Sequence, residues 1–247
     1  MLKIILSGAC GRMGAQVTQL SESRNVKIVA GVDVNVRTDM PYPVYPAFSL
    51  VEEKADAIID FSRPEGLRAL LEYAREKKLP VVLAATGYNE SDLAAIRDAA
   101  REIAVFRSAN MSLGVFVLKT LCARAAAMLP EYEIEIIEKH HNQKLDAPSG
   151  TAVMLYDAVA GPDSEAVHGR QGRTQKRQPQ EIGMHAIRGG SVAGEHEVGF
   201  YGPGEYITLS HLAQDRSIFA NGALRAAAFI AGQAPGEYDM AALVEGL

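Results

Sequence analysis

Continuous apolar runs alternate with segments of helical spacing through the first half of the chain. Five runs are typical of strands buried on both faces, and they lie at 2–7, 26–32, 57–61, 81–84 and 103–106. Apolar residues at helical spacing fill the gaps at 13–20, 63–78 and 89–102. This alternation predicts a parallel sheet with helices on both of its faces, as in α/β proteins.

The second half of the chain changes character after a helical segment at about 113–128. Strands are predicted at 131–140, 185–188, 195–201 and 206–213, with Gly and Pro between them. Runs of strands with one long helix predict an α+β domain that has an open, mostly antiparallel sheet. An open sheet leaves a face or an edge exposed, which favours assembly into a homo-oligomer.

A last helical segment begins near Phe219 and is expected to return to the first domain. The predicted domains are therefore 1–111 with 217–247 for the first, and 112–216 for the second. The first is expected to bind a dinucleotide, and the second to bind the substrate and to form the oligomer.

A glycine-rich turn follows the first strand and opens the first helix. Gly8, Gly11 and Gly14 depart from the usual G-x-G-x-x-G spacing, but they also allow a tight turn that brings backbone close to a pyrophosphate. Asp33 ends the second strand about 20 residues later, where an acid can hydrogen-bond a ribose. The pattern favours a Rossmann-like dinucleotide fold over a generic turn with a surface aspartate.

Two loops follow the fourth and fifth predicted strands, at 85–87 and 108–112. In an open parallel sheet, the loops at the carboxyl ends of the strands line the ligand crevice. Both loops are therefore candidates to hold the nicotinamide end of a dinucleotide. The alternative for each loop is a plain connection between a strand and a helix.

Composition excludes several classes of function. Apolar residues make up 48% of the 247 residues, so a sizeable core is expected, and a net charge of −5 argues against nucleic acid as a partner. Cys10 and Cys122 are too few for a disulfide scaffold or a zinc site. No stretch approaches the ~20 apolar residues of a membrane span. We expect a soluble, cytoplasmic protein, in which the basic stretch 168–180 is a solvated, mobile loop.

The most informative segment lies in mid-chain. His140, His141 and Lys144 follow the end of an apolar strand, and a Pro-Ser-Gly-Thr turn at 148–151 then opens a helical pattern. A helix N-terminus presents backbone N–H groups and a partial positive charge, which suit a carboxylate or a phosphate. The segment therefore predicts a site that holds a small polyanion beside an acid.

Three other interpretations of this segment are weaker. The two histidines could simply end a strand, although Lys144 and the anion-binding turn lie beside them. A metal site is not expected, because neighbouring strand residues point to opposite faces and His140 and His141 would not share one ion. Ser149 does not lie in a G-x-S-x-G elbow, so it is not expected to be a nucleophile.

Several motifs resemble those of the bacterial dihydrodipicolinate reductase family, over essentially the whole chain. The motifs of the first half are Gly8-x-x-Gly11-Arg12-Met13-Gly14, Asp60-Phe61-Ser62-Arg63-Pro64, Ala85-Thr86-Gly87-Tyr88 and Ala109-Asn110-x-Ser112. Those of the second half are Glu138-x-His140-His141-x-x-Lys144-x-Asp146-Ala147-Pro148-Ser149-Gly150-Thr151, Val192-x-Gly194-Glu195-His196 and Phe219-Ala220-x-Gly222-Ala223. The resemblance implies reduction of a cyclic imine dicarboxylate with NADH and/or NADPH, in the diaminopimelate route to lysine, by a homotetramer.

The resemblance also implies roles for single residues. It makes His140 the proton donor, Lys144 the second catalytic residue and His141 a substrate contact, while Gly150 and Thr151 would hold a substrate carboxylate. The residues implied to bind the dinucleotide are Gly8, Gly11, Arg12, Met13, Gly14, Asp33, Ala85, Thr86, Gly87, Ser108, Ala109 and Met111.

Cofactor preference and two rival functions stay open at this point. Asp33 favours NADH because it suits a free ribose 2′-hydroxyl, but Arg37 lies close enough in sequence to meet a 2′-phosphate. Another NAD(P)-linked dehydrogenase is one rival, although an aldehyde dehydrogenase would need a catalytic cysteine. The other is a non-catalytic dinucleotide sensor, which would not need His140, Lys144 and the 150–151 turn together.

Overall fold

The computed structural model describes residues 1–172 and 176–246. The chain divides into two compact units, one made of Met1–Ser112 with Arg216–Leu247 and the other of Leu113–Asp215. Because the first unit contains segments from both halves of the sequence, it is discontinuous along the chain. Each unit has its own sheet and its own hydrophobic core.

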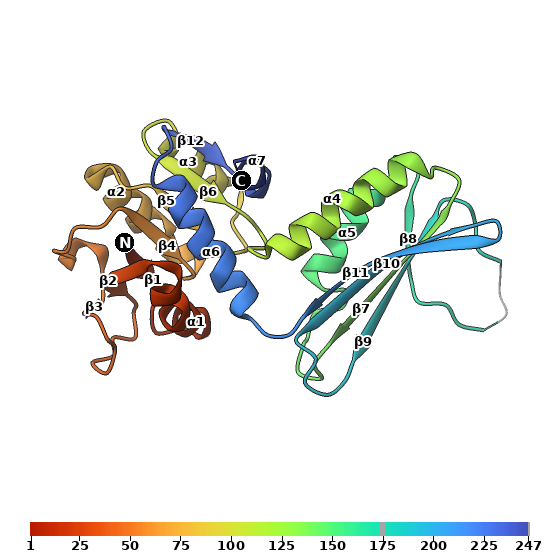
Figure 1. Ribbon diagram of the computed structural model, residues 1–247, viewed down its shortest axis with the longest axis horizontal. Coiled ribbons are helices and arrows are strands. Elements are labelled where there is room, and N and C mark those ends of the chain that lie inside the picture. The colour runs from red at the N-terminus through yellow and green to blue at the C-terminus, as the bar shows by residue number, and fades with distance from the viewer. Residues whose placement is uncertain (173–175, 247) are drawn as a thin grey trace. The chain divides into compact units, whose positions relative to one another are not determined.

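Within the described residues, the first unit holds a seven-stranded sheet in the order β12-β6-β5-β4-β1-β2-β3 (Figure 1). Every pairing in this sheet is parallel. Its strands are β1 (Leu2–Ser7), β2 (Val26–Val32), β3 (Val44–Tyr45), β4 (Ala57–Asp60), β5 (Val81–Leu83), β6 (Ala104–Arg107) and β12 (Gly236–Tyr238). Parallel strands with continuous apolar sequences need cover on both faces, and helices provide that cover.

Helices cover the two faces of this sheet. On one face α1 (Arg12–Ser21) packs against α6 (Ser217–Ile230), which also contacts β4, β5 and β6 (Figure 1). On the other face α2 (Leu67–Lys77) packs against α3 (Glu90–Ala99) over a core that includes Ile5, Ile58 and Val81. The residues next to these core residues along each strand point to the opposite face, because side chains alternate in a strand. The remaining helical elements are α7 (Met240–Glu245) and three short 3-10 turns, Glu22–Arg24, Phe48–Leu50 and Pro64–Gly66.

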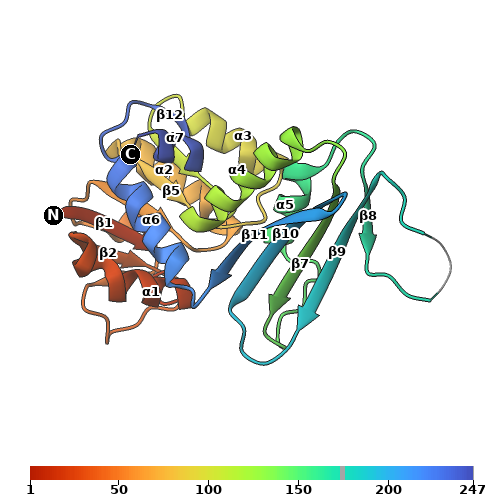
Figure 2. The same ribbon diagram turned by 45° about the vertical axis from the view of Figure 1, so that its right-hand side comes forward.

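The second unit contains, among its described residues, a five-stranded sheet in the order β11-β10-β7-β9-β8 (Figure 2). Its strands are β7 (Glu133–His140), β8 (Glu165–His168), β9 (Glu181–Arg188), β10 (Gly194–Gly202) and β11 (Glu205–Ala213). Here β10 is antiparallel to β7 and β11, whereas β9 is parallel to β7 and β8. The expectation of a mostly antiparallel sheet is corrected to a mixed sheet, because the chain passes through a helix and β8 before β9 runs beside β7.

Two helices cover one face of the second sheet. They are α4 (Leu113–Met128) and α5 (Gly150–Val159), which pack against each other (Figure 2). Their Leu118 and Leu155 meet Ile136 and Val198 of the strands in a buried core. The opposite face carries exposed apolar side chains such as Tyr206 and Leu212. The sheet is therefore buried on one face and open on the other.

The expected fold class is confirmed, with differences in detail. Asn89 caps α3 through a capping box with Asp92, but that helix ends at Ala99, before the expected residue 102. The sequence pattern does not predict the short strands β3, β8 and β12. In the basic stretch 168–180, Arg170 and Arg177 form ion pairs with Glu135 instead of projecting freely into solvent, whereas 173–175 lie outside the described residues. No helix in the described part of the chain has the length and apolar character to cross a membrane.

Candidate active site

The glycine turn of the first unit joins β1 to α1 in a conformation that side chains would obstruct. Gly8 has a φ of +76°, and a Cβ there would lie 2.8 Å from the backbone of Phe61. A Cβ on Gly14 would lie 2.3 Å from the carbonyl oxygen of Ala9. Only glycine fits at these two buried positions, so they allow the tight turn that close approach of backbone to a phosphate requires.

The start of α1 has the properties of an anion site. Gly11 is the N-cap and supplies no side-chain hydrogen bond, and the first turn contains no acidic residue. The first N–H groups of a helix lack partners within it and carry partial positive charge. Arg12 is exposed and Met13 half-buried in this first turn. These features fit the pyrophosphate of a dinucleotide.

Asp33 follows β2 and lies beside the glycine turn. Its Oδ2 accepts a hydrogen bond from the Cys10 N–H at 3.0 Å, and its Oδ1 accepts one from the Asn35 N–H at 2.9 Å. The carboxylate is thereby fixed next to the loop, as the ribose assignment requires. Arg37 pairs with Asp39 at 2.6 Å, and both side chains are exposed.

The two loops implied to hold nicotinamide lie at the carboxyl-terminal end of the strands of the first sheet. They follow β5 and β6, which are parallel neighbours, so both loops leave the sheet at the carboxyl ends of their strands. In the loop after β5, Ala85 is buried while Thr86 and Gly87 are exposed. In the loop after β6, Met111 is buried and Ala109 exposed. The Ser108 hydroxyl donates a hydrogen bond to the Asn110 carbonyl at 2.7 Å, which tightens this loop.

In the second unit, the buried carboxylate of Glu138 organises the mid-chain segment. Its side chain is only 1% exposed and accepts two hydrogen bonds from Arg188, at 2.7 and 2.8 Å. It also accepts the Ser149 N–H at 3.0 Å and contacts His140 Nδ1 at 2.5 Å. Burial raises the pKa of Glu138, but the hydrogen bonds from these partners lower it by more. The pKa of Glu138 therefore lies below its ordinary value. Glu138 is therefore ionised at neutral pH.

His140 ends β7 with its ring turned into the unit, 9% exposed. Burial lowers the pKa of His140, and the neighbouring Glu138 carboxylate opposes that effect. Since Nδ1 faces Glu138, Nε2 is the ring nitrogen left for another partner. His141 is half-buried, and its N–H donates to the Val192 carbonyl at 2.8 Å.

Lys144 and the start of α5 complete the segment. Lys144 Nζ lies 2.8 Å from Asp146 Oδ1, which lowers the pKa of the Asp146 carboxyl. Ser149 is the N-cap of α5, and its Oγ accepts a hydrogen bond from the Ala152 N–H at 3.2 Å. Gly150 is exposed and Thr151 half-buried in the first turn, which holds no acidic residue. The arrangement suits a carboxylate at the helix N-terminus.

Three residues of this cluster have no role among the expectations from the sequence: Glu138, Arg188 and His196. The buried His196 places its Nε2 3.0 Å from Ser149 Oγ, and its ring lies 5.1 Å from the His140 ring. Burial lowers the pKa of His196 to about 4, so it is neutral at pH 7. Glu138 and His196 lie inside motifs that resemble those of the family, whereas Arg188 lies outside them and only the β7–β9 pairing brings it near.

The predicted residues thus form two groups, one in each unit. In the first unit, the glycine turn, Asp33 and the two loops all follow the carboxyl ends of strands in the same sheet. The second gathers His140, Lys144 and the first turn of α5. Among the residues that the structure describes, no cluster of His, Cys, Asp or Glu could hold a metal ion.

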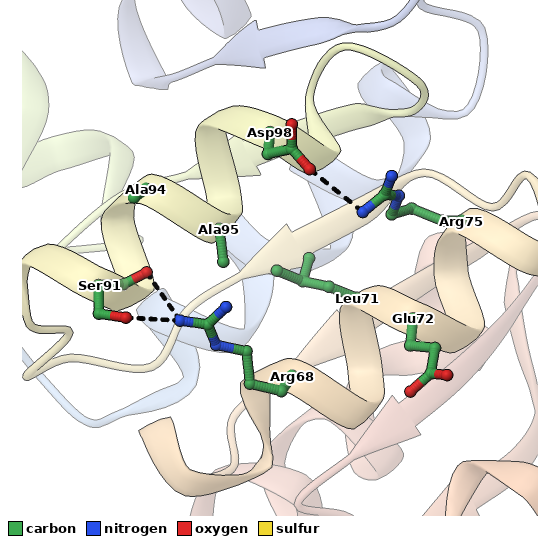
Figure 3. A pocket seen from close by; sticks show the side chains of 8 residues that line it. All are labelled: Arg68, Leu71, Glu72, Arg75, Ser91, Ala94, Ala95 and Asp98. Atoms are coloured by element: carbon green, nitrogen blue, oxygen red, sulfur yellow. Dashed lines mark hydrogen bonds and ion pairs between the residues drawn. The ribbon is translucent and has the colours of Figure 1, made fainter.

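A groove between α2 and α3 is not part of either group (Figure 3). It has a volume of about 590 Å³, and Arg68 donates across it to Ser91 while Arg75 pairs with Asp98 (Figure 3). It lies on the helix layer opposite α1, so it does not adjoin the glycine turn. Its two cations, Arg68 and Arg75, are already engaged within the protein.

Comparison with known proteins identifies the family of this chain. Residues 2–111 match the family of the dihydrodipicolinate reductase N-terminus, and residues 114–244 match the family of its C-terminus. A protein of Caldanaerobacter subterraneus subsp. tengcongensis named 4-hydroxy-tetrahydrodipicolinate reductase is 49% identical over 249 residues, covering 99% of both chains. A Clostridium tetani protein of the same name is 44% identical, covering 97% of this chain and 96% of its own.

Two solved structures share the fold. The dipicolinate-bound dihydrodipicolinate reductase of Paenisporosarcina sp. TG-14 has a TM-score of 0.80 at 23% identity and covers 97% of both chains. A probable dehydrogenase from Thermotoga maritima has a TM-score of 0.61 at 12% identity, covering 100% of this chain and 98% of its own. The resemblance found in the motifs is confirmed by the family matches: the chain belongs to the dihydrodipicolinate reductase family and is an oxidoreductase of that family.

Proposed function

We propose that the chain reduces 4-hydroxy-tetrahydrodipicolinate, a cyclic imine dicarboxylate, to tetrahydrodipicolinate with NADH and/or NADPH. The observation that carries the proposal is the cluster of the second unit. It combines a buried imidazole, a lysine and a helix N-terminus in the segment from His140 to Thr151. The relatives that share this chain's full length carry the name of that activity.

The first unit would hold the cofactor. Its pyrophosphate would lie against the backbone of Gly8, Gly11 and Gly14 and the first turn of α1, with Arg12 and Met13 at the rim. Asp33 would accept a hydrogen bond from the adenosine ribose. The nicotinamide end would lie along the loops after β5 and β6, against Ala85, Thr86, Gly87, Ser108, Ala109 and Met111. When bound, the nicotinamide supplies a hydride.

His140 would deliver the proton that the reduced nitrogen needs. Reduction of a C=N bond places a hydride on carbon and a proton on nitrogen. Nδ1 of His140 is held by Glu138, so the proton would leave from Nε2. A histidine suits this step because its unperturbed pKa of about 6.5 is close to the working pH. Here burial and the Glu138 carboxylate shift the pKa of His140 in opposite directions.

The two substrate carboxylates need cationic and N–H partners. Lys144 would bind and polarise the substrate, and it would exchange its ion pair with Asp146 for one with a substrate carboxylate. The first turn of α5, with Gly150 and Thr151, would hold a carboxylate, and His141 would contact the substrate as well. Binding of both carboxylates would fix the imine close to His140.

Wider aspects of the proposal rest on the family resemblance. The reaction would belong to the diaminopimelate route to lysine in the cytoplasm. The protein would form a homotetramer, and the exposed Ile187, Tyr206 and Leu212 on the open face of the second sheet support self-association. Light scattering on the purified protein tests the tetramer independently of activity.

The test of function is a spectrophotometric assay. Purified protein is mixed with freshly generated 4-hydroxy-tetrahydrodipicolinate and NADH or NADPH, and the loss of reduced-nicotinamide absorbance is followed. We expect turnover that His140→Ala lowers by at least about a hundredfold, as for loss of a general acid. Cofactor binding without turnover would contradict the proposed reaction and favour the sensor interpretation.

A further inference from the structure

Glu138 contacts both halves of the proposed site. Oε2 lies 2.5 Å from Nδ1 of His140, the proposed proton donor. Oε1 accepts the N–H of Ser149, the residue that caps the proposed carboxylate-binding turn, at 3.0 Å. One rigid carboxylate therefore joins two groups that have to keep a fixed separation if a bound imine is to meet the proton.

Arg188 fixes that carboxylate in turn. Its two terminal nitrogens reach the two oxygens of Glu138 at 2.7 and 2.8 Å, in the bidentate geometry typical of strong arginine–carboxylate pairs. The same guanidinium donates to the Asp146 carbonyl at 2.6 Å. Arg188 thus also holds the loop that carries Lys144. Since Glu138 is only 1% exposed, water does not compete for these bonds.

We infer that Glu138 is a positioning residue, which through His140 Nδ1 and the Ser149 N–H holds the proton donor and the carboxylate-binding turn in one fixed geometry. This inference rests on the proposed function. Glu138 need not touch the substrate, because it acts through His140 and Ser149. Its negative charge also favours the protonated imidazole that the reaction needs.

The charged groups around His140 predict the direction in which loss of Glu138 shifts the pKa of His140. The charged or titratable groups near its ring are Glu138 on β7, Arg188 on β9, His196 on β10 and Lys144 in the loop. Burial and the cations lower the pKa of His140, and only Glu138 among these groups raises it. Without the carboxylate, His140 would lose its proton at a lower pH. Activity that depends on protonated His140 would then fall at a lower pH.

The test compares Glu138→Gln with a matched control, Glu135→Gln. Glu135 lies on the same strand but faces the other side, where it contacts His185 at 2.7 Å together with Arg170 and Arg177. For Glu138→Gln we expect kcat to fall at least about tenfold and the alkaline limb of its pH profile to move to lower pH. The dissociation constant of pyridine-2,6-dicarboxylate should rise as well. Glu135→Gln should keep the wild-type kcat, pH profile and dissociation constant.

A merely structural role gives a different result. It would reduce the number of folded sites, counted by the stoichiometry of pyridine-2,6-dicarboxylate binding, while kcat per site and the pH profile stayed those of the wild type. That outcome would overturn the inference. It would leave the proposed function intact, because the latter fails if the wild-type protein does not turn over 4-hydroxy-tetrahydrodipicolinate.

A measurement on the wild-type protein covers the case in which Glu138→Gln does not fold. Histidine labelled with ¹⁵N should show a His140 Nδ1 proton that is strongly shifted downfield, as expected of a short, charge-assisted hydrogen bond. A His140 ring whose proton resides on Nε2 alone, with a bare Nδ1, would overturn the inference.

Discussion

A Cβ atom on Gly194 would lie 3.1 Å from Nε2 of His140. Gly194 begins β10 and is buried, so the ring of His140 rests against backbone at the position where another residue would project a side chain. The nitrogen proposed to deliver the proton is thus the one that this glycine leaves unobstructed. This relationship ties the second-half motif around Gly194 to the mid-chain motif.

Gly194→Ala should therefore reduce activity by displacing the His140 ring. We expect kcat to fall several-fold, because the His140 ring has to move by a few tenths of an ångström to make room for the added methyl group. NADH binding should stay unchanged. Steady-state kinetics measures this effect. Gly189→Ala serves as the control, since a Cβ there meets nothing within 4 Å. Wild-type kcat in Gly194→Ala would contradict the role given to Nε2.

Lys144→Met should weaken substrate binding. Removing the ammonium group deprives a carboxylate of its ion pair, so KM for the dicarboxylate should rise at least about tenfold and kcat should fall. The control is Lys139→Met, because Lys139 on β7 is exposed and pairs with Glu195 at 2.9 Å. If Lys144→Met kept the wild-type KM and kcat, the assignment of Lys144 would be wrong.

Gly14→Ala should damage the cofactor loop. A Cβ at this position would lie 2.3 Å from the Ala9 carbonyl oxygen and 2.5 Å from that of Gly8, so backbone has to move. We expect the dissociation constant of NADH, followed by fluorescence, to rise by more than about tenfold. In the control Gly232→Ala the new methyl group meets nothing within 4 Å, and binding should not change.

Asp33→Ala should shift cofactor preference towards NADPH. A carboxylate binds the ribose 2′-hydroxyl and repels a 2′-phosphate, so its loss weakens NADH binding and spares or improves NADPH binding. The ratio of kcat/KM for the two cofactors is the measurement, with Asp163→Ala, an exposed carboxylate in the other unit, as the control. An unchanged ratio would show that Asp33 does not distinguish a ribose 2′-hydroxyl from a 2′-phosphate.

His196 should make the fold sensitive to acid. Its pKa is lowered to about 4 in the folded chain, against about 6.5 in the unfolded chain. Between these values the unfolded chain binds a proton that the folded chain rejects, so stability is lost as pH falls from about 6.5 to about 4. The loss from this group reaches about 3 kcal/mol as an order of magnitude.

His196→Gln should remove that part of the acid sensitivity. Urea unfolding at pH 7.5 and at pH 4.5 measures it for the wild type, His196→Gln and the control His168→Gln, which alters an exposed histidine on β8. Burial lowers the pKa of His140 and His211 too, so some acid sensitivity will remain. An equal loss in the wild type and His196→Gln would contradict the buried, neutral state of His196.

Apolar patterning predicts the buried strands of this fold and misses the short strands that are only partly buried. Strands such as β1 and β2 are continuous apolar runs, so they are visible in the sequence. By contrast, β3 and β12 contain two and three half-buried or exposed residues, so neither forms a continuous apolar run. They exist because a neighbouring strand offers backbone hydrogen bonds, which is a tertiary cause.

The candidate site divides in the same way. The glycine turn and the segment 140–151 are local in sequence, so motifs are sufficient to find them. Arg188 and His196 come from β9 and β10, and only the register of the second sheet brings them to Glu138 and Ser149. The parallel pairing of β7 with β9 has no local signature, and that pairing places Arg188 beside His140.

The place of β12 in the first sheet has a consequence for the order of synthesis. A ribosome releases β6 early, but the strand that covers its edge, Gly236–Tyr238, comes only after the whole second unit has been made. The second unit can close its sheet while the nascent first unit still lacks α6 and β12. Until those residues emerge, the backbone of β6 offers an unpaired edge to any other chain nearby. Pairing of that edge therefore depends on residues that are among the last of the first unit to be made.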